Sequence, residues 1–173
     1  MITIDGGTGI ILHNGVEVAS EKMVDEWRTT TSQDNGSGNH VVDEYWERND
    51  NNFSLIGKSM TESSGVFSFP ITGLFLIRGA INFFSGNGSM SYQGCIIDAT
   101  TDNGSNYSVI SNNYASTGAT NYYTNATAQA VFDVTDISTH KVRMKTNFPG
   151  TGTILGSSTY QRTCISFTRI GNT

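Results

Sequence analysis

The amino-acid sequence predicts an antiparallel all-β domain, and two observations carry this prediction. Thr, Ser, Asn and Gly number 22, 19, 16 and 19, which is 76 of the 173 residues. All four are poor helix formers, because Thr loses rotamer freedom, Ser and Asn compete for backbone hydrogen bonds, and Gly loses backbone entropy. Apolar residues also recur on a period of two in several short segments bounded by turn-forming residues.

Composition and charge argue against several classes of protein. No run approaches the roughly 18 apolar residues of a membrane-spanning helix, so we expect no membrane insertion. The N-terminus has neither the basic flank nor the apolar block of a secretion signal. The formal net charge of −5 argues against a nucleic-acid binder, which normally carries a concentrated basic stripe.

The first third of the chain differs from the rest in charge. Residues 1–62 hold eleven acidic and four basic side chains, a net of −7, whereas residues 63–173 hold four acidic and six basic, a net of +2. The chain opens with short extended pieces between turns, of which Asn14-Gly15 is a strong hairpin signal. These pieces have too few apolar groups to fold alone. We therefore interpret residues 1–40 as an N-terminal attachment arm and residues 41–173 as the folded domain.

Residues 17–28 form the one segment in which a helix is plausible. Ser20 is able to cap it, and Met23, Val24 and Trp27 are spaced three and four apart. The segment continues into Thr29-Thr30-Thr31 with strand propensity, so we favour a strand over a helix here.

The strongest strand signal lies in residues 74–84. On a period of two, Phe75 and Ile77 share a face with Ile81 and Phe83, and we predict that this face packs in the core. The opposite face is predicted to be only partly exposed to solvent. Further strands are predicted at 41–46, 90–97, 107–114, 128–134, 140–146 and 160–170. The second and third of these flank the turn at residues 102–105 and form a hairpin.

A family resemblance is found just before the long strand. The string Gly65-Val66-Phe67-Ser68-Phe69-Pro70-x-x-Gly73-Leu74-Phe75 resembles the G-x-F-x-x-P-x-x-G-x-Y motif of the complement C-one-q and tumour necrosis factor superfamily, with Phe75 in place of the usual Tyr. The resemblance covers about residues 42–171. It implies a ten-strand jelly-roll sandwich that assembles as a tight homotrimer, with Gly65, Phe67, Pro70, Gly73 and Phe75 in structural roles.

The arm carries a second resemblance. Ile4-Asp5-Gly6-Gly7-Thr8-Gly9-Ile10 followed by Asn14-Gly15-Val16 is similar to an opening repeated in many bacteriophage tail-fibre and virion appendage proteins. This implies a virion structural protein, made in the host cytoplasm without a signal peptide and displayed on the tail or capsid for host attachment or decoration. The arm would contact other virion proteins, with docking residues Ile2, Ile4, Ile10 and Leu12.

No pattern of catalytic, metal-binding or cofactor-binding residues is found. His13, His40 and His140 lie in separate segments without a partner at a motif spacing, so we expect no enzyme. Cys95 and Cys164 have neither metal-ligand nor redox spacing and are expected to be buried free thiols, whereas a disulfide between them would require their two strands to be neighbours. Residues 98–106 lack the glycine position of an EF-hand loop, which favours a polar hairpin over a calcium site.

Tyrosines in turn-rich surroundings are the candidate outer contacts: Tyr107, Tyr114, Tyr122 and Tyr123. Aromatic platforms beside amides and hydroxyls suit sugar binding, so a host-surface glycan is a candidate partner, although packing in the core or a trimer interface is an equal alternative. The row Lys141, Arg143 and Lys145 is expected to be a solvated strand face. A soluble carbohydrate-binding or cytokine-like module remains the alternative to a virion protein.

Overall fold

The computed structural model describes residues 2–4, 11–13, 16–19, 21–51, 55–86 and 90–173, and all regular structure within them is β-strand. The strands are β1 (Ile2–Ile4), β2 (Ile11–His13), β3 (Val16–Ala19), β4 (Met23–Thr29), β5 (Gln33–Asn35), β6 (Gly38–Val41), β7 (Trp46–Arg48), β8 (Leu55–Ile56), β9 (Thr61–Ser63), β10 (Val66–Ser68), β11 (Gly73–Phe84), β12 (Met90–Thr100), β13 (Ser108–Thr117), β14 (Tyr123–Val134), β15 (Lys141–Phe148), β16 (Gly152–Ile154) and β17 (Cys164–Gly171).

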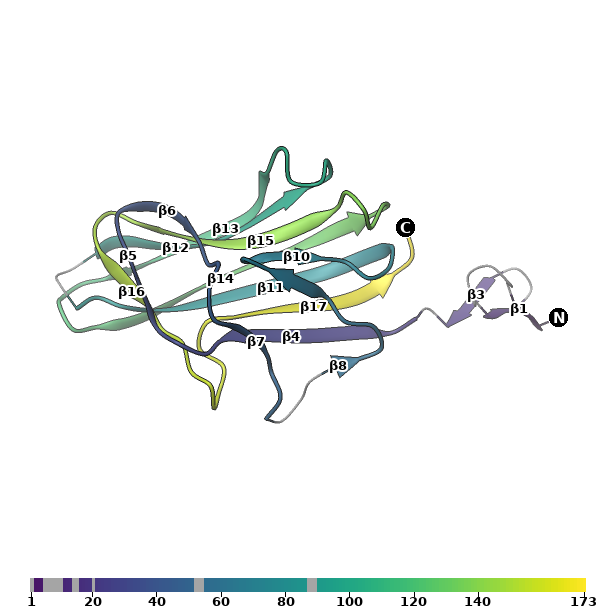
Figure 1. Ribbon diagram of the computed structural model, residues 1–173, viewed down its shortest axis with the longest axis horizontal. Helices are drawn as coiled ribbons and strands as arrows, with labels where there is room; N and C mark the ends of the chain where they lie inside the picture. Colours follow the sequence, from purple (N-terminus) through teal and green to yellow (C-terminus); the bar gives the residue numbers. More distant parts are fainter. Residues whose placement is uncertain (1, 5–10, 14–15, 20, 52–54, 87–89) are drawn as a thin grey trace.

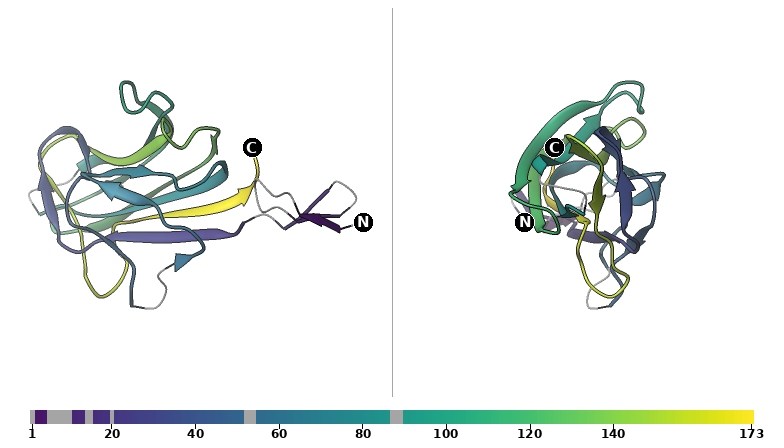
Figure 2. Two further views of the ribbon diagram at one scale, coloured as in Figure 1. Left: turned by 45° about the vertical axis from the view of Figure 1, so that its right-hand side comes forward. Right: turned by 90° about the vertical axis from the view of Figure 1, so that its left-hand side faces the viewer.

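Two antiparallel sheets form a sandwich (Figures 1 and 2). The six-stranded sheet has the order β13-β12-β15-β10-β9, with β6 also paired to β15. The eight-stranded sheet has the order β5-β16-β11-β17-β4-β7, with β14 paired to β11 and β8 to β4. Neighbours far apart in sequence, such as β4 beside β17 and β10 beside β15, give the crossed connections of a jelly roll. The predicted all-β fold is confirmed.

The core lies between the two sheets and follows the predicted alternation. Phe75, Ile77, Ile81 and Phe83 of β11 are fully buried, and the outward residues that alternate with this row are half-buried or exposed. They face the inward residues of the other sheet, which include Cys95, Ile97, Val142 and Met144. Gly79 continues the inward row, and a Cβ there would lie 2.9 Å from the sulfur of Met144. The missing side chain lets the two sheets approach closely at this point.

Within residues 17–28 the structure describes strand in β3 and β4, as favoured, and no helix among the described residues. β4 pairs with β17 over Met23 to Arg28, and Trp27 lies on the inward side, where its ring is 5.6 Å from that of Phe67. The pairing with β17 decides that this segment is a strand, since the spacing of its apolar residues fits either a helix or a strand. Strands β4, β5 and β6 are hydrogen-bonded into the sandwich, so this body begins near Met23. The proposed attachment role of residues 1–40 remains a prediction.

Strands β1, β2 and β3 form a small antiparallel sheet of their own. Figure 1 shows this sheet beyond the end of the sandwich at which β4 begins and the C-terminus lies. Arg169 joins segments at that end, because its guanidinium donates hydrogen bonds to the carbonyl oxygens of Thr72 and Glu21, at 3.0 and 3.1 Å.

The residues of the superfamily motif have clear packing roles. Ser64 and Gly65 both have positive φ, 50° and 78°, which is the two-residue turn that suits the twist of the β9–β10 hairpin. The Phe67 ring lies within 5.2 Å of both Trp46 and Phe167. Gly73 has φ +140°, and a Cβ there would lie 2.5 Å from Nε of Arg169. The motif thus builds a turn, an aromatic core and a close strand approach.

Candidate interaction surfaces

The outward face of the eight-stranded sheet is an open strand surface. Four adjacent strands, β14, β11, β17 and β4, present matched rows of side chains across it. One row runs Val131, Leu76, Thr168 and Val24, and Val131 is 58% exposed. Leu76 and Val24 are half-buried, and apolar side chains left partly exposed on a strand face are typical of a surface that contacts another protein.

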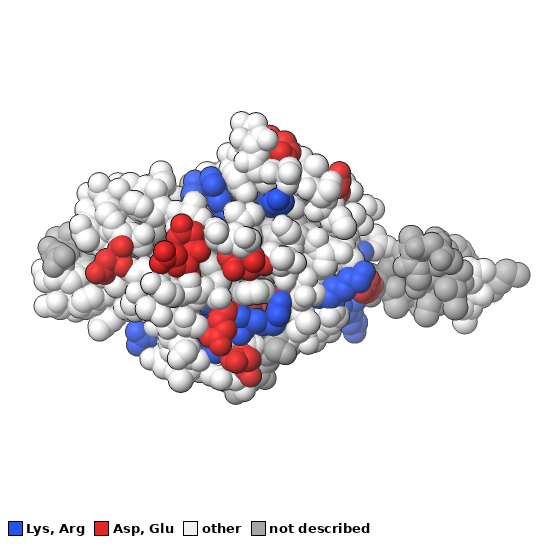
Figure 3. Space-filling view, viewed as in Figure 1, with Lys and Arg blue, Asp and Glu red and all other residues white. Residues whose placement is uncertain are grey.

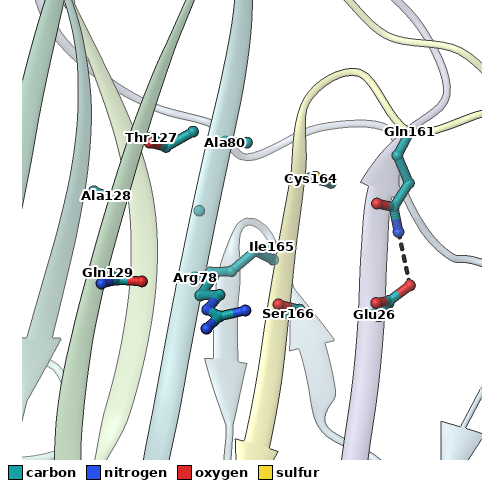
Figure 4. A pocket seen from close by; sticks show the side chains of 11 residues that line it. Glu26, Arg78, Ala80, Thr127, Ala128, Gln129, Gln161, Cys164, Ile165 and Ser166 are labelled. Atoms are coloured by element: carbon teal, nitrogen blue, oxygen red, sulfur yellow. Dashed lines mark hydrogen bonds between the residues drawn. The ribbon is translucent and has the colours of Figure 1, made fainter.

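The next row is polar and borders a shallow hollow of about 370 Å³. Figure 4 shows Gln129, Arg78, Ser166 and Glu26 side by side on the four strands. Glu26 Oε2 accepts a hydrogen bond from the Gln161 amide at 2.8 Å. Ala80, Gly79 and Ala128 also line the hollow. The open face therefore combines an apolar row with one acidic and one basic side chain in the same polar row.

A buried arginine on β4 lies at one edge of the open face. Arg28 is 1% exposed, and its guanidinium donates to Asn49 Oδ1 at 2.9 Å and to Asp50 Oδ1 at 2.8 Å. Glu47 lies 3.5 Å from the same guanidinium. The loop after β7 thus covers this end of the sheet and neutralises the charge beneath it.

The outward face of the six-stranded sheet differs from the prediction of a solvated basic row. Asp98 is 1% exposed, and its Oδ2 is 3.2 Å from Arg143 Nη2 and 2.7 Å from Lys145 Nζ. The Arg143 guanidinium lies 3.8 Å from the centre of the Tyr107 ring. Two of the three basic side chains are therefore committed to a buried ion-pair cluster. On the face seen in Figure 3, acidic and basic side chains lie in small scattered groups separated by uncharged surface.

The four candidate tyrosines do not form one surface. Tyr107 packs over Arg143, and burial raises its pKa. Tyr122 and Tyr123 are 59% and 69% exposed at the start of β14, where the Tyr123 ring lies 4.9 Å from Phe84. Tyr114 lies in the other sheet, on β13. Its role in ligand contact stays a prediction, as do those of the other three.

Tyr114 has an aromatic neighbour that sequence reasoning missed. The Tyr92 ring lies 5.9 Å from it at an interplanar angle of 84°, and the two rings line a hollow of about 390 Å³ together with Asn147. The only sequence signal was the position of Tyr92 on a predicted strand. Its meeting with Tyr114 depends on the β12–β13 register, which shifts between Met90 and Gln93.

The proposed docking residues of the arm lie mostly beyond what the structure describes. Ile2 is 71% exposed on β1. Ile4 and Leu12 lie on β1 and β2, and Ile10 is outside the described residues. Particle docking through these residues therefore remains a prediction.

The predicted polar hairpin is present at residues 98–106. The Asp102 carboxylate accepts hydrogen bonds from Thr100 Oγ1 at 2.6 Å and from the Asn106 amide nitrogens at 2.9 and 2.7 Å. These bonds, first that of Thr100, lower the Asp102 pKa to about 2. The carboxylate is used to close the loop upon itself. Among the described residues no cluster of three or more His, Cys, Asp or Glu is arranged to hold a metal ion.

Both cysteines are free thiols, as expected. Cys95 is buried in the core, and Cys164 is half-buried at the hollow on the open face. Burial raises the pKa of Cys95 to about 12 and that of Cys164 to about 11. His140 is held by Thr135 Oγ1 at 3.3 Å and Thr139 Oγ1 at 3.0 Å, and His40 lies 3.1 Å from the Ser37 carbonyl oxygen. No described helix is long and apolar enough to cross a membrane.

Comparisons with known proteins identify the fold. No protein-family model and no curated protein sequence matches the chain. The crystal structure of murine APRIL at pH 8.5 matches with a TM-score of 0.61 and 13% identity, over 86% of this chain and 99% of that one. Eiger TNF from S. frugiperda matches with a TM-score of 0.63 and 12% identity, over 89% and 96%. At such low identity the likeness shows the fold alone, a jelly roll like that of tumour necrosis factor.

Proposed function

We propose that the protein is a non-enzymatic, homotrimeric jelly-roll knob, attached by its N-terminal arm to a bacteriophage tail or capsid surface, for host adhesion or particle decoration. The open face of the eight-stranded sheet is the observation that supports self-association. A row that contains the apolar side chains of Val131, Leu76 and Val24 lies on it, and three copies packed around an axis would remove these side chains from water.

The charges of the open face suit burial between copies. Its polar row contains Arg78 and Glu26, so burying the row does not require burying net charge. Gln129 and Ser166 of the same row offer further donors and acceptors. A largely apolar surface with a few balanced polar groups is the composition of subunit interfaces.

Two matched valines test the self-association. Val131 on the open face and Val109 on β13 are 58% and 52% exposed, and both lie on strands. We expect Val131→Arg to convert the trimer to monomer, because it places three uncompensated charges at the interface, while Val109→Arg leaves the mass unchanged. Light scattering after size exclusion measures both. Equal masses for the two variants and the wild type would argue against this face as the interface.

Attachment through the arm has separate support. The small β1–β3 sheet lies beyond one end of the sandwich, so an attached particle would leave the rest of the knob exposed (Figure 1). The similarity of residues 4–16 to virion appendage openings supports a phage particle as the attachment site. Antibody labelling of intact particles in the electron microscope tests this proposal. Label on tail or capsid supports it, and protein recovered only in the particle-free fraction contradicts it.

A soluble cytokine-like or carbohydrate-binding module is the second candidate. The fold likeness to murine APRIL and Eiger TNF favours it. The two candidates differ in what the arm does. In the second, a chain lacking residues 1–20 keeps all of its binding activity, and no particle carries the protein.

A further inference from the structure

Two tyrosines form a corner on the outward face of the six-stranded sheet. Tyr92 and Tyr114 are 37% and 45% exposed, and their rings meet edge to face with centroids 5.9 Å apart. Together with Asn147 they line a hollow of about 390 Å³. The corner thus offers two aromatic surfaces at right angles and one side-chain amide.

Gly94 allows this geometry. Tyr114, Gly94 and Asn147 are directly paired across β13, β12 and β15, so they share one row of the sheet face. A Cβ on Gly94 would lie 2.7 Å from Cε1 of Tyr114 and 3.3 Å from Cβ of Asn147. The φ of Gly94 is not in the left-handed region, so its backbone does not require glycine. The space of the missing side chain is used by the tyrosine ring.

The β12–β13 register places the second ring. It shifts between Met90 and Gln93, an irregularity that re-aims side chains next to it. Tyr92 lies within this irregular stretch, two residues before Gly94, and its ring forms the wall beside Tyr114. Exposed aromatic rings held in a fixed mutual angle cost little ordering entropy when a ligand binds.

We propose that the Tyr92–Tyr114–Asn147 corner binds one neutral pyranose ring of a surface glycan. The C–H face of a sugar is apolar and packs on an aromatic ring, while its hydroxyls need amide and phenol partners. Tyr114 supplies the stacking face, Tyr92 the wall, and Asn147 an amide donor and acceptor. Asn39 continues the row beyond Asn147 and is exposed, which extends the amide surface toward a second sugar.

The charges around the corner favour a neutral sugar over an acidic one. Lys145 belongs to the adjacent row, and its ammonium is 2.7 Å from the buried Asp98 carboxylate. Its charge is therefore engaged within the protein. Asn112 lies in that adjacent row on β13 and is exposed, adding a further neutral amide. The corner belongs to the other sheet from the open face, so glycan binding deepens the proposed adhesion function without depending on the trimer.

Saturation-transfer NMR with the full-length protein tests the proposal. The probes are the methyl glycosides of glucose, galactose and N-acetylglucosamine. We expect saturation of at least one sugar, strongest at its axial C–H protons, and affinity about tenfold weaker in Tyr114→Ala, because the stacking face is lost. Tyr114→Phe should keep most of the binding. Tyr160→Ala, which removes a more exposed tyrosine elsewhere, should keep all of it.

Three of the other outcomes contradict the proposal. Absence of saturation for all three sugars contradicts it, as does equal binding by wild type and Tyr114→Ala when both have the same circular dichroism spectrum and Tm. Binding of dextran sulfate alone, unaffected by Tyr114→Ala, would place an anionic ligand elsewhere on the surface. Because oligomer mass is measured separately, a monomer that binds sugar would contradict the trimer and leave this site supported.

Discussion

At the scale of single residues, the buried Asp98 cluster is the feature that the sequence concealed most completely. Arg143 and Lys145 alternate with apolar residues on β15, a pattern typical of a wet strand face. Their partner is 45 residues away from Arg143 and is fixed only by the β12–β15 register, which pairs Asp98 directly with Arg143. Charge pairing across a sheet cannot be predicted from strand patterns without that register.

Asp98→Asn is expected to lower the free energy of unfolding by about 3 kcal/mol, because two largely buried cations lose their counter-charge. Urea unfolding at neutral pH measures the loss. Asp43→Asn, which changes an exposed carboxylate, is the control and should leave the free energy unchanged. Equal stability of the Asp98 and Asp43 variants would mean that the cluster contributes nothing.

The raised pKa values of the two thiols predict slow alkylation of the native protein. With pKa values of about 12 for Cys95 and about 11 for Cys164, both stay protonated at pH 8.5, whereas the unfolded chain titrates near 9. Iodoacetamide should therefore label the unfolded chain much faster than the native one. Because the folded pKa values lie above the unfolded value, stability should fall as pH rises above about 9. Rapid labelling of both native thiols would contradict this.

At the scale of elements, the turns and strand approaches of the superfamily motif are predictable, and their partners are not. The glycine and proline positions indicated a turn and a close passage ahead of the long strand. That Gly73 lies against Arg169, from the last strand, became visible only in the structure. The strand in residues 23–29 was favoured over a helix from the Thr run that follows, but its place beside β17 required the fold.

Gly73→Ala is expected to destabilise the protein by about 2 kcal/mol, because φ is +140° and the new Cβ would lie 2.5 Å from Arg169 Nε. Gly118→Ala is the matched control, since no atom lies within 4 Å of a Cβ there. Thermal unfolding followed by circular dichroism compares the two. A Gly73 variant as stable as the Gly118 variant would show that the strand approach tolerates a side chain.

Removal of the β1–β3 sheet tests whether the sandwich is an independent element. These strands pair only with one another, and deletion of residues 1–20 keeps Glu21, whose carbonyl accepts from Arg169. We therefore expect an unchanged Tm for the shortened chain. A deletion of residues 1–40 should unfold it, because β4, β5 and β6 are paired into both sheets. Unfolding by the shorter deletion would contradict the independence of the sandwich.

At the scale of the whole molecule, the amino-acid composition predicted the fold class. The excess of Thr, Ser, Asn and Gly predicted strands and turns, and the motif indicated a jelly roll, which the fold likeness confirms. The open face was predicted only in part. The alternation in β11 predicted that its second face is partly exposed to solvent, but the pairing with β14, β17 and β4 that extends this face could not be read from the sequence. Tyr114 of the tyrosine corner was a sequence candidate, but its meeting with Tyr92 and Asn147 was unforeseen, since the three side chains lie on three strands.

The molar mass of the full-length protein in solution tests the central claim most directly. Size exclusion with light scattering at micromolar concentration should give three times the chain mass of 18.7 kDa, because the open face is buried between copies. A mass equal to that of one chain, unchanged by Val131→Arg, would contradict the trimeric knob.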